Sequence, residues 1–407
     1  FYALTTTCCQ IDLLKLFHGG FSTGHGYLRE PQGIASYAAL AAIAIQSNQN
    51  DQHGGQSVPN FDYSMAEGIG KTFRKQYRAK LREALEDLLD TDDETALVQA
   101  AIEAGKQATG DSDVRLETHA ATFDDAAAKA IAATGRLDAG KAAHLVAHAR
   151  RRATAKTDRE TYQAMEGFVH NLNTMHSRAG AQTPFSSINY GTDTSPEGRM
   201  AIRNILLAED AGLGHGETPI FPIHIFKVKE GVNYNPGDPN YDLFELSCKV
   251  SAKRLFPNYV FLDSPFNLQY YKPGHPETEV ATMGCRTRVM GNVYDPERQI
   301  AYSRGNLSFT SINLPRLAIE SHGDEALFYK KLDDMLELVA QQLLDRFEIQ
   351  ASKRVYNYPF LMGQGVWLDS DKLGPNDEVR EVLKHGTLSI GFIGLAETLT
   401  ALYGHHH

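Results

Sequence analysis

From about residue 183 onward, strand-like segments alternate with helical segments, and this alternation is the strongest constraint on the fold. The strand-like segments are rich in β-branched and aromatic residues. The helical segments carry capping signals, such as Ser195 and Pro196 ahead of a helix that is expected to end near Ala211. Such alternation predicts an α/β fold. The expected strands are 183–191, 218–228, 258–262 and 307–313, and the expected helices are 241–254, 315–321 and 324–347.

The first part of the chain is predicted to contain one strand followed by helices. Residues 2–13 (YALTTTCCQIDL) are rich in Thr and apolar residues and predict a strand. Helices are expected at 31–49 and 64–89, the second with an apolar residue every three or four positions. Thr91 and Glu94 have the spacing of a capping box. The Ala-rich stretch that follows, 95–150, predicts helices at the periphery.

Charge and composition exclude several classes of protein. The net charge of −10 and the pI of about 5.9 argue against a nucleic-acid-binding face. No apolar run reaches the length of about 18 residues that a membrane span needs. Nothing at the start resembles a signal peptide. The chain has four cysteines and no C-x-x-C pair, which argues against structural zinc and fits a reducing cytoplasm.

Two motif-like strings are better explained as helix surface. Residues 68–72 (GIGKT) resemble the end of a phosphate-binding loop, but Met65 stands where its first glycine should be. His144 and His148 are four residues apart without the glutamate of a zinc-protease motif, so a solvated helix face is expected.

The cysteines allow more than one interpretation. Cys8 and Cys9 are adjacent on an expected strand, so their side chains should point to opposite faces. Both could be small core residues, and Cys248 is expected in the core of its helix. Cys285 is different, since Gly284 permits close backbone approach and Arg286 and Arg288 could lower the pKa of a thiol or bind an anion.

Blocks spread along the chain resemble the anaerobic (class III) ribonucleoside-triphosphate reductase family. The resemblance covers nearly the whole chain and is weakest across 95–160. The blocks are, in order, TTTCCQIDL, SNQNDQHGG, AQTPFSSINYGTD, ETPIFPIHIFKVKEGVN, GDPNYDLFELS, MGCRTRV, RGNLSFTSINLPRLA and HGTLSIGFIGLAE.

The resemblance implies a ten-stranded α/β barrel of the glycyl radical enzyme type, with a finger loop near 280–290. Residues 1–94 would hold the first barrel strand and the N-terminal helices. Residues 95–160 would form a peripheral helical excursion, and 161–407 a further portion of the barrel.

It also implies radical chemistry on ribose. A glycyl radical would pass its unpaired electron to Cys285, whose sulfur would take the hydrogen atom from C3′ of the substrate. Cys8 would donate a hydrogen atom at the 2′ position, and Asn306 would hold substrate hydroxyls or formate. Met283 would help shape a formate pocket. Radical intermediates must be kept from water, which suits a closed barrel.

Other roles are inferred on weaker grounds. Thr7, Gln182, Thr183 and Ser186 are expected to line the pocket as polar groups. The helix at 32–49 is expected to form a homodimer face beside a site for dNTP or ATP effectors. A radical SAM activating enzyme is the other expected partner, and neither nucleic acid nor membrane is.

The given sequence ends before the family pattern is complete. The glycyl radical site and the zinc-binding cysteines are expected in a C-terminal part that it lacks, so the fragment alone is expected to be inactive, with formate as reductant in the whole enzyme. Two alternatives stay open. One is another glycyl radical enzyme of the pyruvate formate-lyase type, and the other is a non-catalytic nucleotide-binding paralogue.

Overall fold

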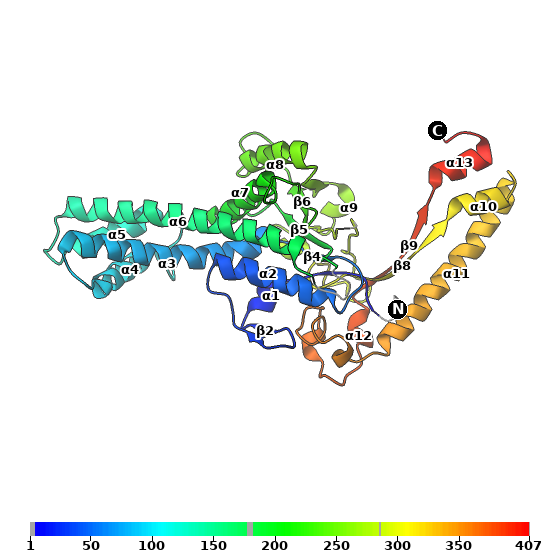
Figure 1. The fold of residues 1–407 in the computed structure, drawn as a ribbon, viewed down its shortest axis with the longest axis horizontal. Helices are drawn as coiled ribbons and strands as arrows, with labels where there is room; N and C mark the ends of the chain where they lie inside the picture. Colours follow the sequence, from blue (N-terminus) through cyan, green and yellow to red (C-terminus); the bar gives the residue numbers. More distant parts are fainter. Residues whose placement is uncertain (1–4, 177–181, 285, 407) are drawn as a thin grey trace.

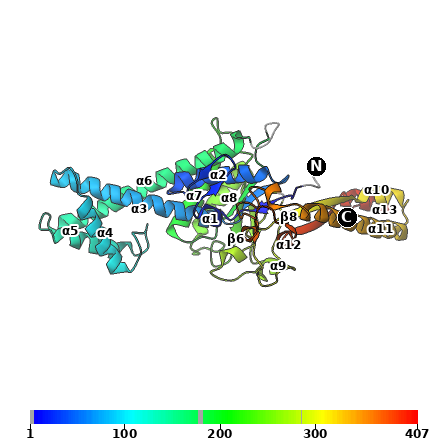
Figure 2. The same ribbon diagram turned by 90° about the horizontal axis from the view of Figure 1, so that it is seen from below.

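The computed structural model describes residues 5–176, 182–284 and 286–406. A parallel sheet lies at the centre of an elongated molecule, between a long helical arm and a smaller extension of strands and helices (Figure 1). The view from below shows the arm and the extension pointing in opposite directions (Figure 2). The sheet and the helices together confirm the α/β class.

The central sheet has five parallel strands in the order β1-β4-β5-β6-β7. Its three inner strands are buried along their whole length, which suits a sheet covered on both faces. Strands were predicted correctly at 183–191, 218–228 and 258–262, although β6 begins later than expected. The strands are β1 (Cys9–Gln10), β4 (Gln56–Val58), β5 (Ser186–Tyr190), β6 (Ile223–Val228) and β7 (Asn258–Phe261).

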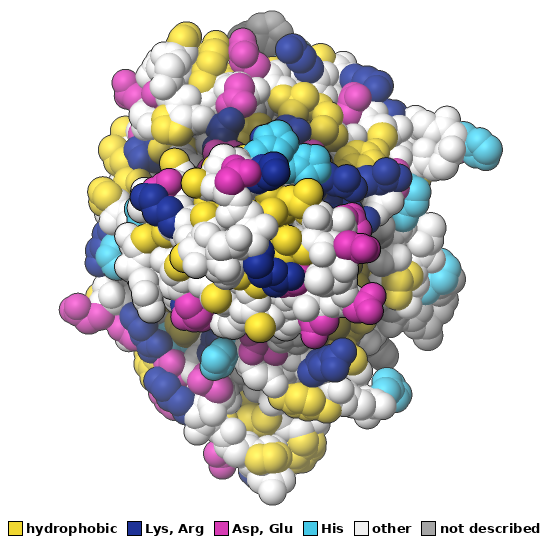
Figure 3. All heavy atoms as spheres, turned by 90° about the vertical axis from the view of Figure 1, so that its left-hand side faces the viewer, with side chains coloured by type: hydrophobic (Ala, Val, Ile, Leu, Met, Phe, Trp, Pro, Cys, Tyr) yellow, Lys and Arg dark blue, Asp and Glu magenta, His cyan; other side chains and the backbone are white. Residues whose placement is uncertain are grey.

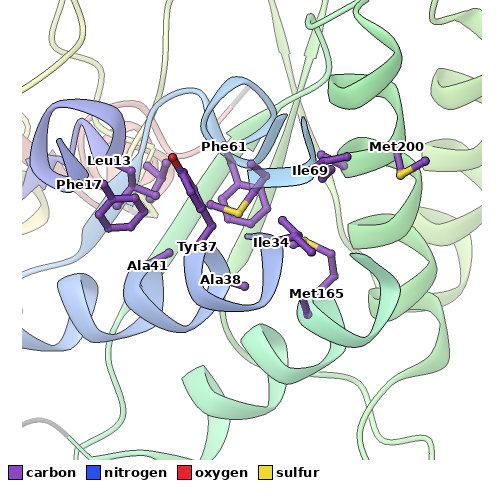
Figure 4. Close-up of a cluster of buried hydrophobic side chains, with 14 of the residues drawn as sticks. Leu13, Phe17, Ile34, Tyr37, Ala38, Ala41, Phe61, Ile69, Met165 and Met200 are labelled. Atoms are coloured by element: carbon purple, nitrogen blue, oxygen red, sulfur yellow. The ribbon is translucent and has the colours of Figure 1, made fainter. Parts of the chain in front are cut away.

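One large apolar core joins this sheet to its helices. Leu13, Tyr37, Phe61 and Met165 come from four different helices and meet in this core (Figure 4). Burial of the apolar side chains in this core stabilises the packing of the helices on the sheet. The covering helices are α1 (Leu13–Phe17), α2 (Ile34–Gln49), α3 (Phe61–Leu89), α6 (Ala139–Thr174), α7 (Pro196–Ala211) and α8 (Tyr241–Arg254).

The predicted strand at 2–13 is wrong for most of its length. Within the described residues, the strand is only Cys9–Gln10, and helix α1 begins at Leu13. Asp12 is the reason, because its carboxylate accepts a hydrogen bond from the backbone N–H of Lys15 at 3.1 Å and caps the helix. Leu13, Leu16 and Phe17 then share one buried face.

Residues 95–174 form helices, as the Ala-rich sequence predicts. α4 (Thr95–Thr109) and α5 (Ala120–Ala132) pack beside the outer ends of α3 and α6. α6 is 36 residues long and continues through residue 160 without a break. Seen from the end of the arm, basic and acidic side chains alternate over the surface and do not gather by sign (Figure 3).

The extension is built on a second parallel pair, β8 (Asn306–Asn313) and β9 (Thr387–Ile393). A small separate core holds α10 (Leu314–Glu320) and α11 (Glu325–Ala351) against β8. α13 (Leu395–Tyr403) contacts α10. Several large apolar side chains of this part are exposed: Phe309, Leu338, Leu344, Ile390, Phe392, Ile393, Leu395 and Tyr403.

Residues 303–306 run antiparallel to β1. The N–H of Gln10 donates to the carbonyl oxygen of Arg304 at 2.9 Å, and the N–H of Ser303 donates to the carbonyl oxygen of Gln10 at 2.8 Å. The two parallel sheets therefore meet along β1 with opposite strand directions.

The hairpin expected at 286–304 is wrong. Among the described residues the segment is irregular, with one isolated bridge between Thr282 and Arg288. Its backbone carbonyls are bonded by the buried side chain of Arg304 in place of a second strand. The remaining elements are β2 (Phe21–Ser22), β3 (Tyr27–Leu28), α9 (Pro265–Leu268), η1 (Pro276–Thr278), η2 (Val355–Asn357), η3 (Ser370–Lys372) and α12 (Arg380–Leu383).

Two local expectations about helix faces are also wrong. Cys248 is exposed, because the buried stripe of α8 follows Leu243, Ser247 and Val250 and leaves Cys248 one position off. Gly68 lies inside helix α3 as expected but is buried, and a Cβ there would come within 2.7 Å of the Tyr37 ring. In the part of the chain that the structure describes, every helix is too short or too polar to cross a bilayer.

Candidate active site

Cys8 and Cys9 are both fully buried but lie in different surroundings, as their adjacency predicts. Cys9 belongs to the large core between the sheet and its helices. Burial raises the pKa of the Cys9 thiol, so this group stays protonated and inert. Cys8 instead forms a small apolar cluster with Met283 and Val289. Only one thiol of the pair therefore faces the irregular segment before β8.

Cys285 lies outside the described residues, but its neighbours are placed. Met283 and Val289 stand on either side of it in the sequence, and both contact the Cys8 cluster. The N–H of Met283 donates to the carbonyl oxygen of Thr287 at 3.0 Å. Gly284 lies so close to the sheet that a Cβ would approach the Phe185 ring to 2.8 Å.

Asn306 joins β8 to both neighbouring strands. Its carbonyl oxygen accepts hydrogen bonds from the N–H groups of Thr7 at 3.0 Å and Cys8 at 3.2 Å. Its side-chain Nδ2 donates to Ser389 Oγ on β9 at 2.5 Å. Its Oδ1 is buried and has no hydrogen-bond partner among the described residues. An amide oxygen in this state can accept a hydrogen bond from a ligand hydroxyl.

A close backbone approach holds Asn306 beside Cys8. At Gly305, an added Cβ would lie 1.8 Å from the carbonyl oxygen of Cys8. No side chain fits in that space, so only glycine permits this contact between the start of β8 and β1.

A cavity of about 510 Å³ opens at the N-terminal ends of β1, β4 and β5. This volume is in the range of small-molecule sites. Thr7 and Gln182, two of the predicted pocket residues, line the cavity. Thr183 is half-buried near it, and Ser186 is buried and donates to the carbonyl oxygen of Pro184 at 3.1 Å. The full lining is Thr7, His53, Gly54, Gly55, Gln182, Phe185, Ser308, Phe309 and Arg346.

Two potentially cationic side chains in this lining were not anticipated. His53 Nε2 lies 3.3 Å from Thr7 Oγ1, and its Nδ1 lies 3.0 Å from Thr5 Oγ1. Arg346, from α11, donates to Ser308 Oγ at 3.0 Å and to the carbonyl oxygen of Phe309 at 3.1 Å. The block SNQNDQHGG could have directed attention to His53, whereas no local pattern distinguishes Arg346.

Arg304 ties the irregular segment to the start of β9. Its guanidinium is buried and donates to four carbonyl oxygens, those of Met290, Gly291, Ile300 and His385, at 2.8 to 3.0 Å. Burial lowers the pKa of Arg304 to about 10, so the group remains charged at neutral pH.

A second polar network lies at the opposite, C-terminal ends of the strands. The ammonium group of Lys227 is buried 3.0 Å from Glu279 Oε2, which also accepts a hydrogen bond from Thr192 Oγ1 at 2.7 Å. Burial, together with the nearby carboxylate of Asp62, raises the pKa of Asp193 to about 7. This network bonds Glu279, which precedes the irregular segment in the chain. We therefore interpret the network as structural.

The histidines of the arm show no metal-binding arrangement. His144 and His148 are neighbours on α6, with ring centroids 6.4 Å apart. No cluster of three or more His, Cys, Asp or Glu suited to a metal ion occurs within the described ranges.

Comparison with known proteins adds to this geometry. The family model described as "Anaerobic ribonucleoside-triphosphate reductase" matches residues 1–407. The chain is 28% identical over 405 residues to the Salmonella typhimurium protein of that name, covering 98% of this chain and 47% of that relative. It is 26% identical over 399 residues to the enterobacteria phage T4 protein of the same name, covering 96% of this chain and 54% of that relative.

Solved structures agree at the level of the fold. The anaerobic ribonucleotide reductase from Thermotoga maritima in complex with dATP and CTP superimposes with a TM-score of 0.58 at 13% identity. The match covers 98% of this chain and 52% of that one. The chain thus spans about half the length of the relatives that it matches.

Proposed function

Because the chain belongs to the family of anaerobic ribonucleoside-triphosphate reductases, we propose that the whole protein reduces ribonucleoside triphosphates to 2′-deoxyribonucleoside triphosphates. The observation that carries this proposal is the buried contact of Cys8 with Met283 and Val289, which flank Cys285 in sequence. Radical chemistry on a sugar requires reacting groups that are kept away from solvent, and Cys8 is buried beside residues that flank Cys285 in sequence.

We propose that Cys285, Cys8 and Asn306 each act at a different atom of the ribose. The sulfur of Cys285 takes the hydrogen atom from C3′, the 2′-hydroxyl leaves as water with the proton of the 3′-hydroxyl, and Cys8 supplies a hydrogen atom to C2′. The reductant returns a hydrogen atom to Cys8 and an electron, with a proton, to the 3′-ketone, and Cys285 then returns its hydrogen atom to C3′. Asn306 holds a ribose hydroxyl through its Oδ1, which is buried and has no partner among the described groups. A glycyl radical elsewhere in the whole protein would supply the unpaired electron.

Formate is the proposed reductant, giving up two electrons and leaving as carbon dioxide. Met283 supports this choice, because it packs beside Cys8 in a small buried apolar cluster. Zinc, if the whole protein holds it, belongs to cysteines outside this chain.

The cavity at the N-terminal strand ends is the proposed substrate entrance. Thr7, Gln182, Thr183 and Ser186 supply polar groups in or near its wall. Arg346 is the proposed partner of an anionic group of the nucleotide, because its guanidinium is already oriented by Ser308 and faces the cavity lining.

The finer architecture is also a proposal. The exposed apolar residues of β8–β9 support completion of a ten-stranded barrel, with the segment around 280–290 as its finger loop. We also propose the division into 1–94, 95–160 and 161–407, which rests on the resemblance to the family. The antiparallel pairing of residues 303–306 with β1 is compatible with such a barrel.

Partners are proposed from the family and from one surface feature. The groove of about 310 Å³ between α2 and α6 is lined partly by small residues, including Ala35, Ala39 and Gly167, and supports a homodimer contact there. Effector dNTP or ATP would bind nearby, and a radical SAM enzyme would activate the whole protein. A cytoplasmic location completes the proposal.

The test uses the complete, anaerobically activated protein that contains this sequence. Cys285→Ala is expected to abolish formation of labelled deoxynucleotide while substrate binding stays within about twofold of wild type. Cys248→Ala, at the exposed cysteine of α8, is the matched control and should retain full turnover. Turnover near wild type in Cys285→Ala would refute the thiyl assignment.

A further inference from the structure

Residues 276–284, here called the leg, lead to residue 285. The leg is attached to the central sheet at three positions. At the base, Asn60 Nδ2 donates to the carbonyl oxygen of Pro276 at 2.7 Å. One step further, Lys227 and Thr192 bond the carboxylate of Glu279. The third position is Thr282, three residues before 285, and its partner is Asn189 on β5.

The contact between Asn189 and Thr282 is reciprocal. Asn189 Nδ2 donates to the carbonyl oxygen of Thr282 at 2.9 Å, and the N–H of Thr282 donates to Asn189 Oδ1 at 2.9 Å. The side-chain amide thus pairs with a backbone peptide as a neighbouring strand would. Ser57 Oγ on β4 adds a third bond to the same carbonyl oxygen at 3.2 Å.

Asn189 is fully buried, where an amide without partners would be costly. Its Nδ2 also donates to Ser57 Oγ and to the carbonyl oxygen of Val58 on the neighbouring strand, whereas its Oδ1 accepts from the N–H of Thr282. Beyond this point, the contacts of the described residues of the leg with the sheet and with Cys8 are apolar, those of Met283 with Cys8 and of Gly284 with Phe185. Asn189 therefore makes the last polar attachment before the thiol-bearing part of the segment.

We propose that Asn189 is a positioning residue that fixes the backbone at Thr282, so that Met283 covers Cys8 and the following residues are held at a constant height over the sheet. This inference rests on the proposed function for its catalytic meaning. The two lower attachments hold the base without Asn189, so its loss frees only the upper end of the leg.

The first test uses the 407-residue chain and thiol modification followed by peptide mass spectrometry, with 4,4′-dithiodipyridine as the probe. In Asn189→Ala, the modification rate of Cys8 is expected to rise at least tenfold, because Met283 no longer stays over it. Cys9, buried in the separate large core, should keep its rate and serves as the internal standard.

The matched control is Asn204→Ala. Asn204 is also a buried asparagine, and its side-chain Nδ2 donates to Asp158 Oδ1 and to the carbonyl oxygen of Met200, but it lies between α6 and α7. It should leave Cys8 unchanged. An unchanged Cys8 rate in Asn189→Ala, or equal rises for Cys8 and Cys9, would overturn the positioning role.

The second test separates this inference from the proposed function. In the complete activated protein, Asn189→Ala is expected to lower kcat at least tenfold with KM for the ribonucleotide within twofold, since Asn189 is absent from the cavity lining. Asn189→Asp, which keeps an acceptor for Thr282 but loses the donor, should behave like Asn189→Ala.

The outcomes are distinguishable. Wild-type protein that forms no deoxynucleotide would refute the proposed function whatever Asn189 does. Active wild type together with unchanged kcat in Asn189→Ala would refute only the positioning role.

Discussion

At the scale of single residues, the site depends on how closely two backbones approach. Gly305 lets the start of β8 lie against the carbonyl oxygen of Cys8, and this contact brings the Asn306 amide beside the Cys8 backbone. The neighbouring N–H groups of Thr7 and Cys8 bond the carbonyl oxygen of Asn306. A methyl group at Gly305 would collide with backbone, which cannot move aside as a side chain could.

We therefore expect Gly305→Ala to lower the free energy of unfolding by about 1–3 kcal/mol, the usual cost of overpacking. Urea denaturation of the 407-residue chain followed by circular dichroism measures this change. Gly214→Ala is the control, since a Cβ there meets nothing within 4 Å. Equal stability of the two variants would contradict the close approach.

Residue-level predictions from sequence succeeded where a local rule applied. Alternation along a strand correctly separated Cys8 from Cys9. Asn189 and Arg346 could not be found in this way, because their partners lie 93 and 38 residues away in the chain. Only the tertiary register brings these groups together.

At the scale of elements, α7 is attached to β6 through a buried acid and imidazole. Glu209 Oε2 lies 3.4 Å from His224 Nε2, and Tyr190 Oη lies 2.9 Å from His224 Nδ1. Burial raises the pKa of Glu209 to about 8, although Arg254 lowers it slightly. Burial lowers the pKa of His224 to about 3. Both groups are thus neutral in the folded protein at pH 7.

These shifts act on stability in opposite directions. The folded state keeps the Glu209 proton up to about pH 8 whereas the unfolded state loses it near 4.5, so this group lowers stability as pH rises between those values. His224 binds its proton more readily when unfolded, so it adds stability as pH rises to 6.5. Above pH 6.5 only the Glu209 effect remains from this pair.

Between pH 6.5 and 8 we therefore expect Glu209→Gln to gain stability relative to wild type by about 2 kcal/mol, at roughly 1.4 kcal/mol per pH unit. Urea denaturation at several pH values measures the difference between the two proteins. Glu230→Gln, at an exposed glutamate, should show a constant difference across this range. A pH-independent difference for Glu209→Gln would contradict the buried neutral carboxyl.

Elements with clear capping signals were predicted well. Ser195 and Pro196 begin α7 at the expected place, and Ser195 Oγ accepts from the N–H of Gly198. The first strand was predicted too long because its Thr and apolar content suits a strand and the cap at Asp12 was not recognised. The hairpin expected at 286–304 failed because the buried side chain of Arg304, at its own end, bonds carbonyl oxygens of that segment.

At the scale of the whole molecule, the two cores are unequal. The large core extends from the sheet into the arm, whereas the extension has a small core of its own. In α2, nine of 16 residues are buried, but in α13 Thr398 is the single buried residue among nine. Local opening should therefore be easier in the extension.

Hydrogen exchange followed by mass spectrometry tests this difference. In the 407-residue chain, we expect amides of α13 to exchange at least tenfold faster than those of α2, because few buried contacts resist local unfolding there. α2 is the matched control as a helix of the central body. Equal protection of the two helices would show that the extension is as stable as the sheet.

The resemblance of short blocks to one family correctly indicated the family and the α/β class over nearly the whole chain. It could not supply the path of residues 276–305, because an irregular segment has no periodic pattern. That path depends on contacts with Asn60, Lys227 and Asn189, each contributed by a strand or strand end far away in sequence.

Arg304 has a consequence for how the two sheets tolerate substitution. Its planar fork serves four carbonyl oxygens from three separate stretches of backbone, and one of those stretches leads directly into β9. Lysine would keep the charge but offers three tetrahedrally arranged donors at a single point. At least one peptide oxygen would lose its donor. The contact between the two sheets would then loosen, although the net charge of the protein had not changed.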